Sequence, residues 1–320
     1  MHGSMDGAVK DRFDMNKQPP ENFQCRVCGG KDFAFLYRVH DLWNNNNQIT
    51  ASYYQCKSCN LIFQFPMNIP EDFKVLYPES YEVYQPKKAG RLEVFGLEKR
   101  AKIILKQKNG GKLLDIGCAT GEFIKYMRDY KGWNVTGVEP DQKVALHAST
   151  TYKLEIINSS VENFEIEKKF DVITLWDVLE HVEEPEECLE KIFDALNQDG
   201  VLVLRLPNSA SLDAKIFQKY WAGIDSPRHF YIFNPENLSI ILKNKGFKII
   251  DIRTDIGIYL NFVKSIQFYF SDKFNRTWFS ESVINILRSF PIRLLLYPFF
   301  SGISLLKKGN SMVITAIKYT

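Results

Sequence analysis

The strongest constraint on the fold of this chain is an alternation of short apolar runs and helix-like segments after Gly111. The apolar runs have the length of buried strands, and the segments between them show helical periodicity. Because successive parallel strands need a crossover connection, this order predicts an α/β fold with a mostly parallel sheet and helices on both faces. The predicted strands are 112–116, 134–139, 154–158, 170–176, 200–206, 246–253 and 311–318. The predicted helices are 91–107, 122–129, 141–151, 184–196 and 235–245.

The length and composition of the whole chain limit the number of domains that it can form. With 320 residues, 45% of them apolar and 25% charged, it has the length and composition of one large globular domain or of two unequal ones. No leading apolar segment resembles a signal peptide, so a cytoplasmic location is expected. The predicted divisions are a disordered tail at 1–20, a small cysteine-containing unit at 21–68, a connector with N-terminal helices at 69–110, and an α/β domain at 111–320 with an apolar insertion at 258–308.

The segment "KLLDIGCATGEF" at 112–123 predicts a ligand-binding loop after the first parallel strand. Gly117 and Gly121 let the backbone turn tightly and approach a ligand, but the third glycine of a dinucleotide fingerprint is absent. Asp115 would repel a phosphate and suits a ligand with an ammonium group. Glu139, at the end of the next strand, can accept both hydroxyls of a ribose. S-adenosylmethionine combines these groups.

Four motifs, "LLDIGCATGEF", "VTGVEP", "SSVENF" and "FDVITLWDVLEHV", closely resemble in order and spacing those of class I S-adenosylmethionine-dependent methyltransferases. The resemblance covers residues 112–255, with 311–318 as the closing strand, and implies a Rossmann-like seven-stranded sheet. It is specific for fold and cofactor rather than for substrate. Ala119 stands where this family more often has glycine. The resemblance implies a cofactor site made of Asp115, Gly117, Cys118, Gly121, Glu139, Pro140, Ser160, Val161, Glu162 and Asp177, with Ser160, Val161 and Glu162 near the adenine.

Two Cys-x-x-Cys pairs predict a metal site in the small N-terminal unit. Cys25 and Cys28 form the first pair and Cys56 and Cys59 the second, so four thiolates can close a tetrahedral Zn²⁺ site. A site with four thiolates has no open position, which makes this zinc structural and the unit zinc-ribbon-like. Free or disulfide-linked cysteines are the alternative. A redox role is disfavoured because neither pair opens a helix in a βαβ unit.

Two of the five histidines are candidates for the general base that a hydroxyl acceptor needs. His181 follows the fourth strand, and His229 lies in the loop after the fifth, so both belong to the carboxyl edge of the sheet. His181 has an equally plausible role in local packing or capping. His229 is favoured because Arg228 beside it can hold an anionic group of the acceptor.

The cysteine unit, "LEHV" and "PRHFYIF" together resemble a narrower group of methyltransferases that act on nucleotide-linked sugars and other glycan precursors. In its sugar C-methylating members a Tyr and a Glu occupy the positions of Ser226 and Arg228, and a long extra carboxyl-terminal domain follows. These departures favour O-methylation over carbanion chemistry. Tyr220, Trp221 and Tyr231 could stack on a sugar acceptor or equally fill the core.

The apolar insertion contains "LLLYPFFSGISLL", which is too short to span a bilayer. Cationic residues flank it, so a peripheral membrane contact through 284–308 and a lipid-linked sugar acceptor are expected. A cap over the active site and a dimer contact remain open alternatives.

Two other functions remain open. An RNA methyltransferase would use the cysteine unit for RNA binding, but the basic residues of 21–66 are scattered and partly offset by acids, so no nucleic acid is favoured. A non-catalytic protein that binds S-adenosylmethionine is the other, although Asp115 and Glu139 are both intact.

Overall fold

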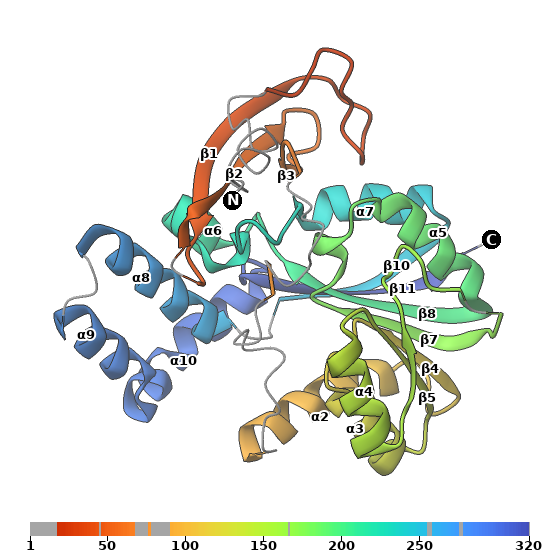
Figure 1. Cartoon of the computed structure of the whole chain (residues 1–320). Helices are drawn as coiled ribbons and strands as arrows, with labels where there is room; N and C mark the ends of the chain where they lie inside the picture. The colour runs from red at the N-terminus through yellow and green to blue at the C-terminus, as the bar shows by residue number, and fades with distance from the viewer. Residues whose placement is uncertain are drawn as a thin grey trace, which may run out of the picture. The chain divides into compact units, whose positions relative to one another are not determined.

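The computed structural model describes residues 18–44, 46–67, 76–77, 90–165, 167–254, 258–274 and 278–319. The chain forms two compact units (Figure 1). The first unit comprises the described residues of Met1–Leu76, Pro207–Ile240 and Thr254–Met312. The second unit comprises those of Tyr77–Leu206, Ile241–Arg253 and Val313–Thr320. Most of the predicted tail at 1–20 and much of the predicted connector lie outside the described residues.

The second unit is built on a seven-stranded sheet with the order β10-β11-β8-β7-β4-β5-β6. Strands β4 to β8 pair in parallel, whereas β10 pairs with β11 in antiparallel register. This arrangement confirms the predicted Rossmann-like, mostly parallel sheet. Its strands are β4 (Lys112–Ile116), β5 (Asn134–Glu139), β6 (Glu155–Asn158), β7 (Phe170–Trp176), β8 (Leu196–Pro207), β10 (Phe247–Arg253) and β11 (Ser311–Lys318).

Helices cover both faces of this sheet. Figure 1 shows α2, α3 and α4 on one face and α5 on the other. The central strands β4 and β7 are therefore buried on both sides, which explains their continuous apolar sequences. Local signals place the helix ends: the Asp141 carboxylate caps α4 by accepting from Val144 N, and Gly132 ends α3 at φ +71°. The helices are α2 (Arg91–Leu105), α3 (Glu122–Lys131), α4 (Gln142–Tyr152), α5 (Pro185–Ala195) and α7 (Pro235–Asn244).

Strand β8 begins at Leu196, earlier than the predicted start at residue 200. Leu196 pairs with Phe170, and the register then shifts before Val172 pairs with Val201. The Asn197 side chain donates to Asp171 at 2.8 Å. The polar residues 197–199, which the sequence leaves outside the predicted strand, are therefore included in β8 through a register shift.

The first unit contains a four-stranded sheet with the order β1-β2-β3-β9. Three strands come from the cysteine-containing segment, namely β1 (Phe33–Asp41), β2 (Asn46–Cys56) and β3 (Ile62–Gln64). The fourth, β9 (Tyr231–Ile232), comes from the loop segment that carries His229, and it pairs with β3. The cysteine-containing segment, predicted as a unit of its own, thus shares one sheet with the predicted substrate loop.

Helices complete the first unit. The short helices α6 (Leu212–Phe217), η4 (Gln218–Tyr220) and η5 (Ala222–Ile224) precede β9. The apolar insertion folds into α8 (Ile258–Phe274), α9 (Trp278–Arg288) and α10 (Phe290–Leu305), which contact one another. Within the described residues, no single helix has the length and apolar character needed to cross a membrane. Glu281–Arg288 and Phe290–Leu305, which meet at 71°, reach both criteria only as a pair.

Candidate active site and metal-binding cluster

The loop between β4 and α3 has the geometry of a ligand cradle. Gly117 and Gly121 have φ angles of +72° and +83°, which favour glycine. A Cβ on Gly117 would lie 2.5 Å from the Val178 side chain, so no larger residue fits there. Ala119 has φ +48°, and this conformation gives a physical reason for the glycine that is commoner in the family. The backbone N–H groups of Gly117 and Cys118 donate to Val138 O and fix the loop on β5.

Two buried carboxyl groups lie at the ends of neighbouring strands beside this loop. Asp115 accepts a 2.5 Å hydrogen bond from the Thr174 hydroxyl. Glu139 accepts bonds of 3.0 Å from the backbone N–H groups of Ala119 and Asp141, one on each oxygen. Burial raises the pKa of both carboxyl groups to about 7, although these hydrogen bonds oppose the shift. Each Glu139 oxygen retains a second lone pair, which can accept a ribose hydroxyl.

The side chain of Cys118 packs against the sheet, and its thiol also lies 3.8 Å from Ala119 O. A Cβ on Gly137 of β5 would lie 2.5 Å from the Cys118 sulfur, so the thiol fills the space above that glycine. Burial raises the pKa of the Cys118 thiol well above its usual range. Cys118 therefore contributes its backbone to the loop, and its side chain belongs to the core.

The loop predicted to approach the adenine is fixed to the end of β5. The Asn158 side chain, at the end of β6, donates to Glu139 O at 2.9 Å and to Pro140 O at 3.1 Å. Ser160 and Val161 are half-buried and Glu162 is exposed, so all three retain accessible surface beside this junction. Their contact with adenine remains a prediction.

Two arginines, Arg100 and Arg205, lie at the carboxyl end of β7, and the sequence did not predict them as site residues. The Arg100 guanidinium of α2 lies 5.0 Å from the Trp176 ring centroid, and Arg205 pairs with Asp177 at 2.9 Å. Burial and the charge of Arg205 lower the pKa of Arg100, while Asp177 and Asp115 oppose this change. Within the described residues, the buried Trp176 Nε1 and Arg205 Nε find no hydrogen-bond acceptor. These donors and charges suit a carboxylate of a ligand, whereas Asp115 suits its ammonium group.

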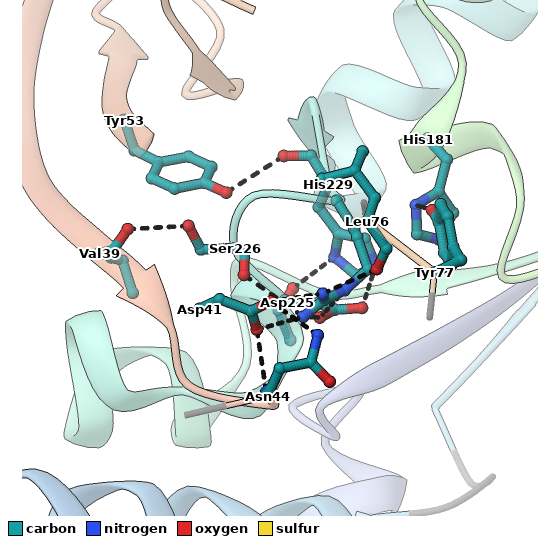
Figure 2. Close-up of polar contacts among 12 residues, drawn as sticks. Val39, Asp41, Asn44, Tyr53, Leu76, Tyr77, His181, Asp225, Ser226 and His229 are labelled. Carbon is teal, nitrogen blue, oxygen red and sulfur yellow. Dashed lines mark hydrogen bonds and ion pairs between the residues drawn. The ribbon is translucent and has the colours of Figure 1, made fainter. Parts of the chain in front are cut away.

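His181 lies just beyond the carboxyl end of β7, on the short helix η3 (Leu179–His181). Its Nδ1 is 2.9 Å from the Tyr77 hydroxyl, and the two rings meet edge to face (Figure 2). Both residues belong to the second unit. The tyrosine therefore orients the imidazole at the edge of the sheet where the glycine loop also lies.

His229 lies in the first unit, in the loop that leads to β9. Its Nδ1 is 2.9 Å from Gly223 O, and its Nε2 is 3.8 Å from the Asp225 carboxylate. Because a carbonyl oxygen can only accept, the proton resides on Nδ1, and Nε2 is the basic nitrogen. A neutral imidazole in this tautomer can accept a proton at Nε2, the nitrogen nearer the Asp225 carboxylate.

The prediction that Arg228 holds an anionic group of the acceptor is wrong. Its guanidinium is fully buried and makes five hydrogen bonds, to both oxygens of Asp41, to Asp225, and to the carbonyls of Leu76 and Ser226. Figure 2 labels these four partners. Burial disfavours the charge, but the two carboxylates outweigh it and raise the pKa of Arg228. All five N–H donors are used within the protein, so none remains for an acceptor.

The three candidate sugar-stacking aromatic residues pack in the interior. Trp221 joins Tyr53 and Ile232 in a buried apolar cluster, and Tyr231 is also buried. Tyr220 donates its hydroxyl to Asp272 at 2.6 Å and packs on Ala222 and Phe268. Of the two roles that the sequence left open for them, the structure selects core packing.

The four paired cysteines form one cluster in the first unit. Cys25 and Cys59 are 3.6 Å apart at their sulfurs, as are Cys28 and Cys56, and all four sulfurs lie within 4.8 Å of one another. These distances exceed a disulfide bond, and all four are free thiols. The donor set and its close spacing suit a tetrahedral metal ion.

The two Cys-x-x-Cys turns of this cluster repeat the same backbone geometry. In each turn the residue after the second cysteine is left-handed, Gly29 at φ +70° and Asn60 at φ +59°. Its N–H donates to the carbonyl of the first cysteine, Cys25 or Cys56, at 2.8 and 2.9 Å. Two matched turns therefore present four sulfurs to a common centre.

A Rossmann-like sheet with a glycine loop and two acids at neighbouring strand ends defines the class of S-adenosylmethionine-dependent methyltransferases. Residues 90–252 match the family described as a methyltransferase domain, which is 163 of 320 residues. The chain belongs to this family. The cysteine cluster precedes the matched region.

Individual relatives share parts of the chain. The "Ubiquinone biosynthesis O-methyltransferase, mitochondrial" of Schizosaccharomyces pombe is 36% identical over 104 residues, which cover 30% of this chain and 38% of that protein. The "Ubiquinone biosynthesis O-methyltransferase" of Rickettsia bellii is 24% identical over 187 residues, covering 55% and 76%. A solved structure of a possible histamine N-methyltransferase from Thermotoga maritima is 16% identical and aligns with 77% of this chain and 96% of its own, at a TM-score of 0.47.

Proposed function

We propose that the protein transfers a methyl group from S-adenosylmethionine to a hydroxyl oxygen of a small-molecule acceptor. The observation that carries this proposal is the pair of buried acids, Asp115 and Glu139, beside a glycine loop within the methyltransferase region. Buried carboxyl groups with a raised pKa favour a cationic partner, and they disfavour the diphosphate of a dinucleotide.

The described residues fit the proposed cofactor. Glu139 would hold the ribose hydroxyls and the Gly117 loop the methionine portion, with Arg100 and Arg205 near its carboxylate. The cofactor supplies an electrophilic methyl group on a sulfonium. The task of the protein is to exclude water and to align the acceptor oxygen with that methyl carbon.

Cofactor binding should weaken as the pH falls below about 7. In the protein without cofactor, burial raises the pKa of Asp115 and Glu139 to about 7, whereas a cationic ligand favours their ionised forms. Protons therefore compete with the cofactor, and the dissociation constant should rise by up to about tenfold per pH unit for each coupled group. Calorimetric titration with S-adenosylmethionine from about pH 5.5 to 8.5 measures this slope. Glu139→Gln should bind more weakly at high pH and show a shallower slope; a flat wild-type profile would contradict the assignment.

A histidine would act as the base that accepts the hydroxyl proton. His229 is the first candidate because its Nδ1–H donates to Gly223 O and leaves Nε2 basic, and His181 is the second. We expect His229→Asn to lower kcat by about a hundredfold with little change in cofactor affinity. Asparagine keeps a donor near the position of Nδ1 and removes the base. His181→Asn tests the second candidate in the same way.

His147→Asn is the matched control, because this histidine lies on α4 beside Thr151 and outside the proposed machinery. It should retain the wild-type rate. The pH profile of kcat distinguishes a base from a packing residue, since only loss of a base removes the acidic limb of the profile. If both His229→Asn and His181→Asn keep the wild-type rate and profile, neither histidine is the base.

Two acceptor classes have separate support. The cysteine unit and the "PRHFYIF" loop support a sugar or glycan precursor, including a lipid-linked one. The names of the sequence relatives support instead an acceptor in ubiquinone biosynthesis. Burial of Arg228 removes one argument for a nucleotide-linked acceptor, because its charge is neutralised within the protein.

A labelling experiment distinguishes these classes. The protein is incubated with methyl-labelled S-adenosylmethionine and cell extract, and label is then measured in nucleotide sugars, lipids, quinone precursors and RNA. Treatment of the labelled product with base separates the two kinds of O-methyl product, because base cleaves methyl esters and leaves methyl ethers intact. Label in RNA would overturn the small-molecule acceptor, and label on nitrogen or carbon of the product would overturn the proposed O-methylation.

The metal proposed for the cysteine cluster is Zn²⁺, in a structural role. Four sulfur ligands leave no position for substrate or water, so the ion would stabilise the turns rather than take part in methyl transfer.

A further inference from the structure

Helix α10 has an inward face that packs in the first unit and an outward face whose side chains are largely exposed. Phe300 and Ile303 are buried against Tyr259 and Phe262. The outward side chains include seven large apolar residues, each between 55% and 85% exposed. We call them the α10 patch: Phe290, Leu294, Leu295, Tyr297, Phe299, Leu305 and Leu306.

The α10 patch is too concentrated to be ordinary surface composition. Single exposed leucines are common, but seven large exposed apolar side chains on one helix and its C-cap concentrate apolar area on a short segment. Such surfaces mark contacts with membranes or other macromolecules. The charges around the patch indicate which of these it suits.

Positive charges lie at both ends of the α10 patch. Arg288 and Arg293 lie near the start of α10, and Lys307 and Lys308 follow its end. Glu281 is the one acidic residue in the sequence 278–308. An apolar helix face with flanking cations is complementary to a surface that is apolar beneath and anionic at the level of its head groups.

We propose that the α10 patch docks on an anionic lipid surface, with α10 lying in the plane of the interface. The helix has 16 residues. At 1.5 Å per residue it is about 24 Å long, less than the ~30 Å hydrocarbon core, so it would lie along the membrane rather than cross it. This inference goes beyond methyl transfer and does not depend on it.

A second copy of the chain is a less suitable occupant. In a two-fold dimer the same patch meets itself, so the cations of Arg288, Arg293, Lys307 and Lys308 in one copy would lie near those of the other. Like charges brought together in this way oppose association, whereas anionic lipid head groups neutralise them.

The test is flotation of the full chain with vesicles of phosphatidylcholine alone or mixed with phosphatidylglycerol, at low salt. Wild type should bind the mixed vesicles, and salt should weaken the binding. Leu295→Glu should lower the partition coefficient at least about tenfold, since it removes one leucine from the apolar contact. Leu146→Glu, the same change at an exposed leucine of α4, should bind like wild type.

A second variant tests the charges. Lys307→Gln with Lys308→Gln should weaken binding to the mixed vesicles by about fivefold for each lysine, with no effect of that size on phosphatidylcholine alone. Thermal melting establishes that every variant is folded. Failure of wild type to float, or equal flotation of Leu295→Glu, overturns the proposal. The proposal is also overturned if wild type does not bind vesicles but forms a dimer that Leu295→Glu converts to a monomer. That result would identify the occupant of the α10 patch as a second copy of the chain.

Discussion

Replacing Cys56 by serine should abolish metal binding and unfold much of the first unit. Cys56 is fully buried at the end of β2, and its backbone N–H pairs with Leu61 O in the second cysteine turn. Structural zinc sites contribute an apparent ~10–16 kcal/mol in small metal-dependent peptides, so loss of one of four ligands removes a large part of the stability of this segment. Zinc measured by mass spectrometry should fall from one per chain to well below one, and calorimetry should show a lower melting temperature.

Cys188→Ser is the matched control for the cysteine cluster. Cys188 is also a buried free thiol, but it lies on α5 in the second unit. Burying a hydroxyl there should cost about 1–3 kcal/mol and leave the metal content unchanged. Wild-type protein purified without chelator that contains no metal, or Cys56→Ser protein that retains one zinc per chain, would contradict the proposed site.

The parallel sheet could be predicted because each of its strands carries a local signal. Strands β4, β5 and β7 begin and end at the predicted residues, since each is a short apolar run bounded by polar or turn residues. The glycines and acids of the cofactor loop are also local, because they follow directly from the end of a strand. A pattern within a few residues was sufficient for these features.

The environment of Arg228 could not be predicted in this way. Its main partner, Asp41, is 187 residues away in the sequence, in the segment that contains the cysteines. The pairing of β3 with β9, which brings these segments into one sheet, involves a strand of two residues with no periodic signal. The sequence showed an arginine beside a histidine in a loop, which is equally consistent with a ligand contact and with a buried ion pair.

Arg100 was missed for a related reason. It lies on α2, before the first strand of the matched motifs, and nothing in its local sequence separates it from the neighbouring Lys99 and Lys102. Its position over Trp176 depends on how α2 packs on the sheet. A residue recruited by tertiary packing from outside the motifs carries no signal that a single sequence can reveal.

Replacing Arg228 by methionine should destabilise the first unit by about 3–5 kcal/mol, because the change leaves two buried carboxylates without their cation. Asp41 accepts two hydrogen bonds from Arg228 and two from Asn44. These four bonds stabilise its buried negative charge. Asp225 loses the bond from Arg228 Nε at 2.7 Å. The measurement is the free energy of unfolding by urea, with fluorescence of the tryptophans as the signal.

Two further variants separate the cost of unpaired charge from the loss of packing. Arg128→Met changes a partly exposed arginine of α3 that pairs with Asp129 and donates to the carbonyls of Tyr152 and Lys153. It leaves no buried carboxylate unpaired, so it should cost only about 1–2 kcal/mol. Combining Arg228→Met with Asp41→Asn and Asp225→Asn removes all three charges, and it should recover part of the stability lost by Arg228→Met alone. If Arg228→Met unfolds at the same urea concentration as wild type and instead raises the KM of an anionic acceptor, the arginine binds substrate and the buried network is not its main role.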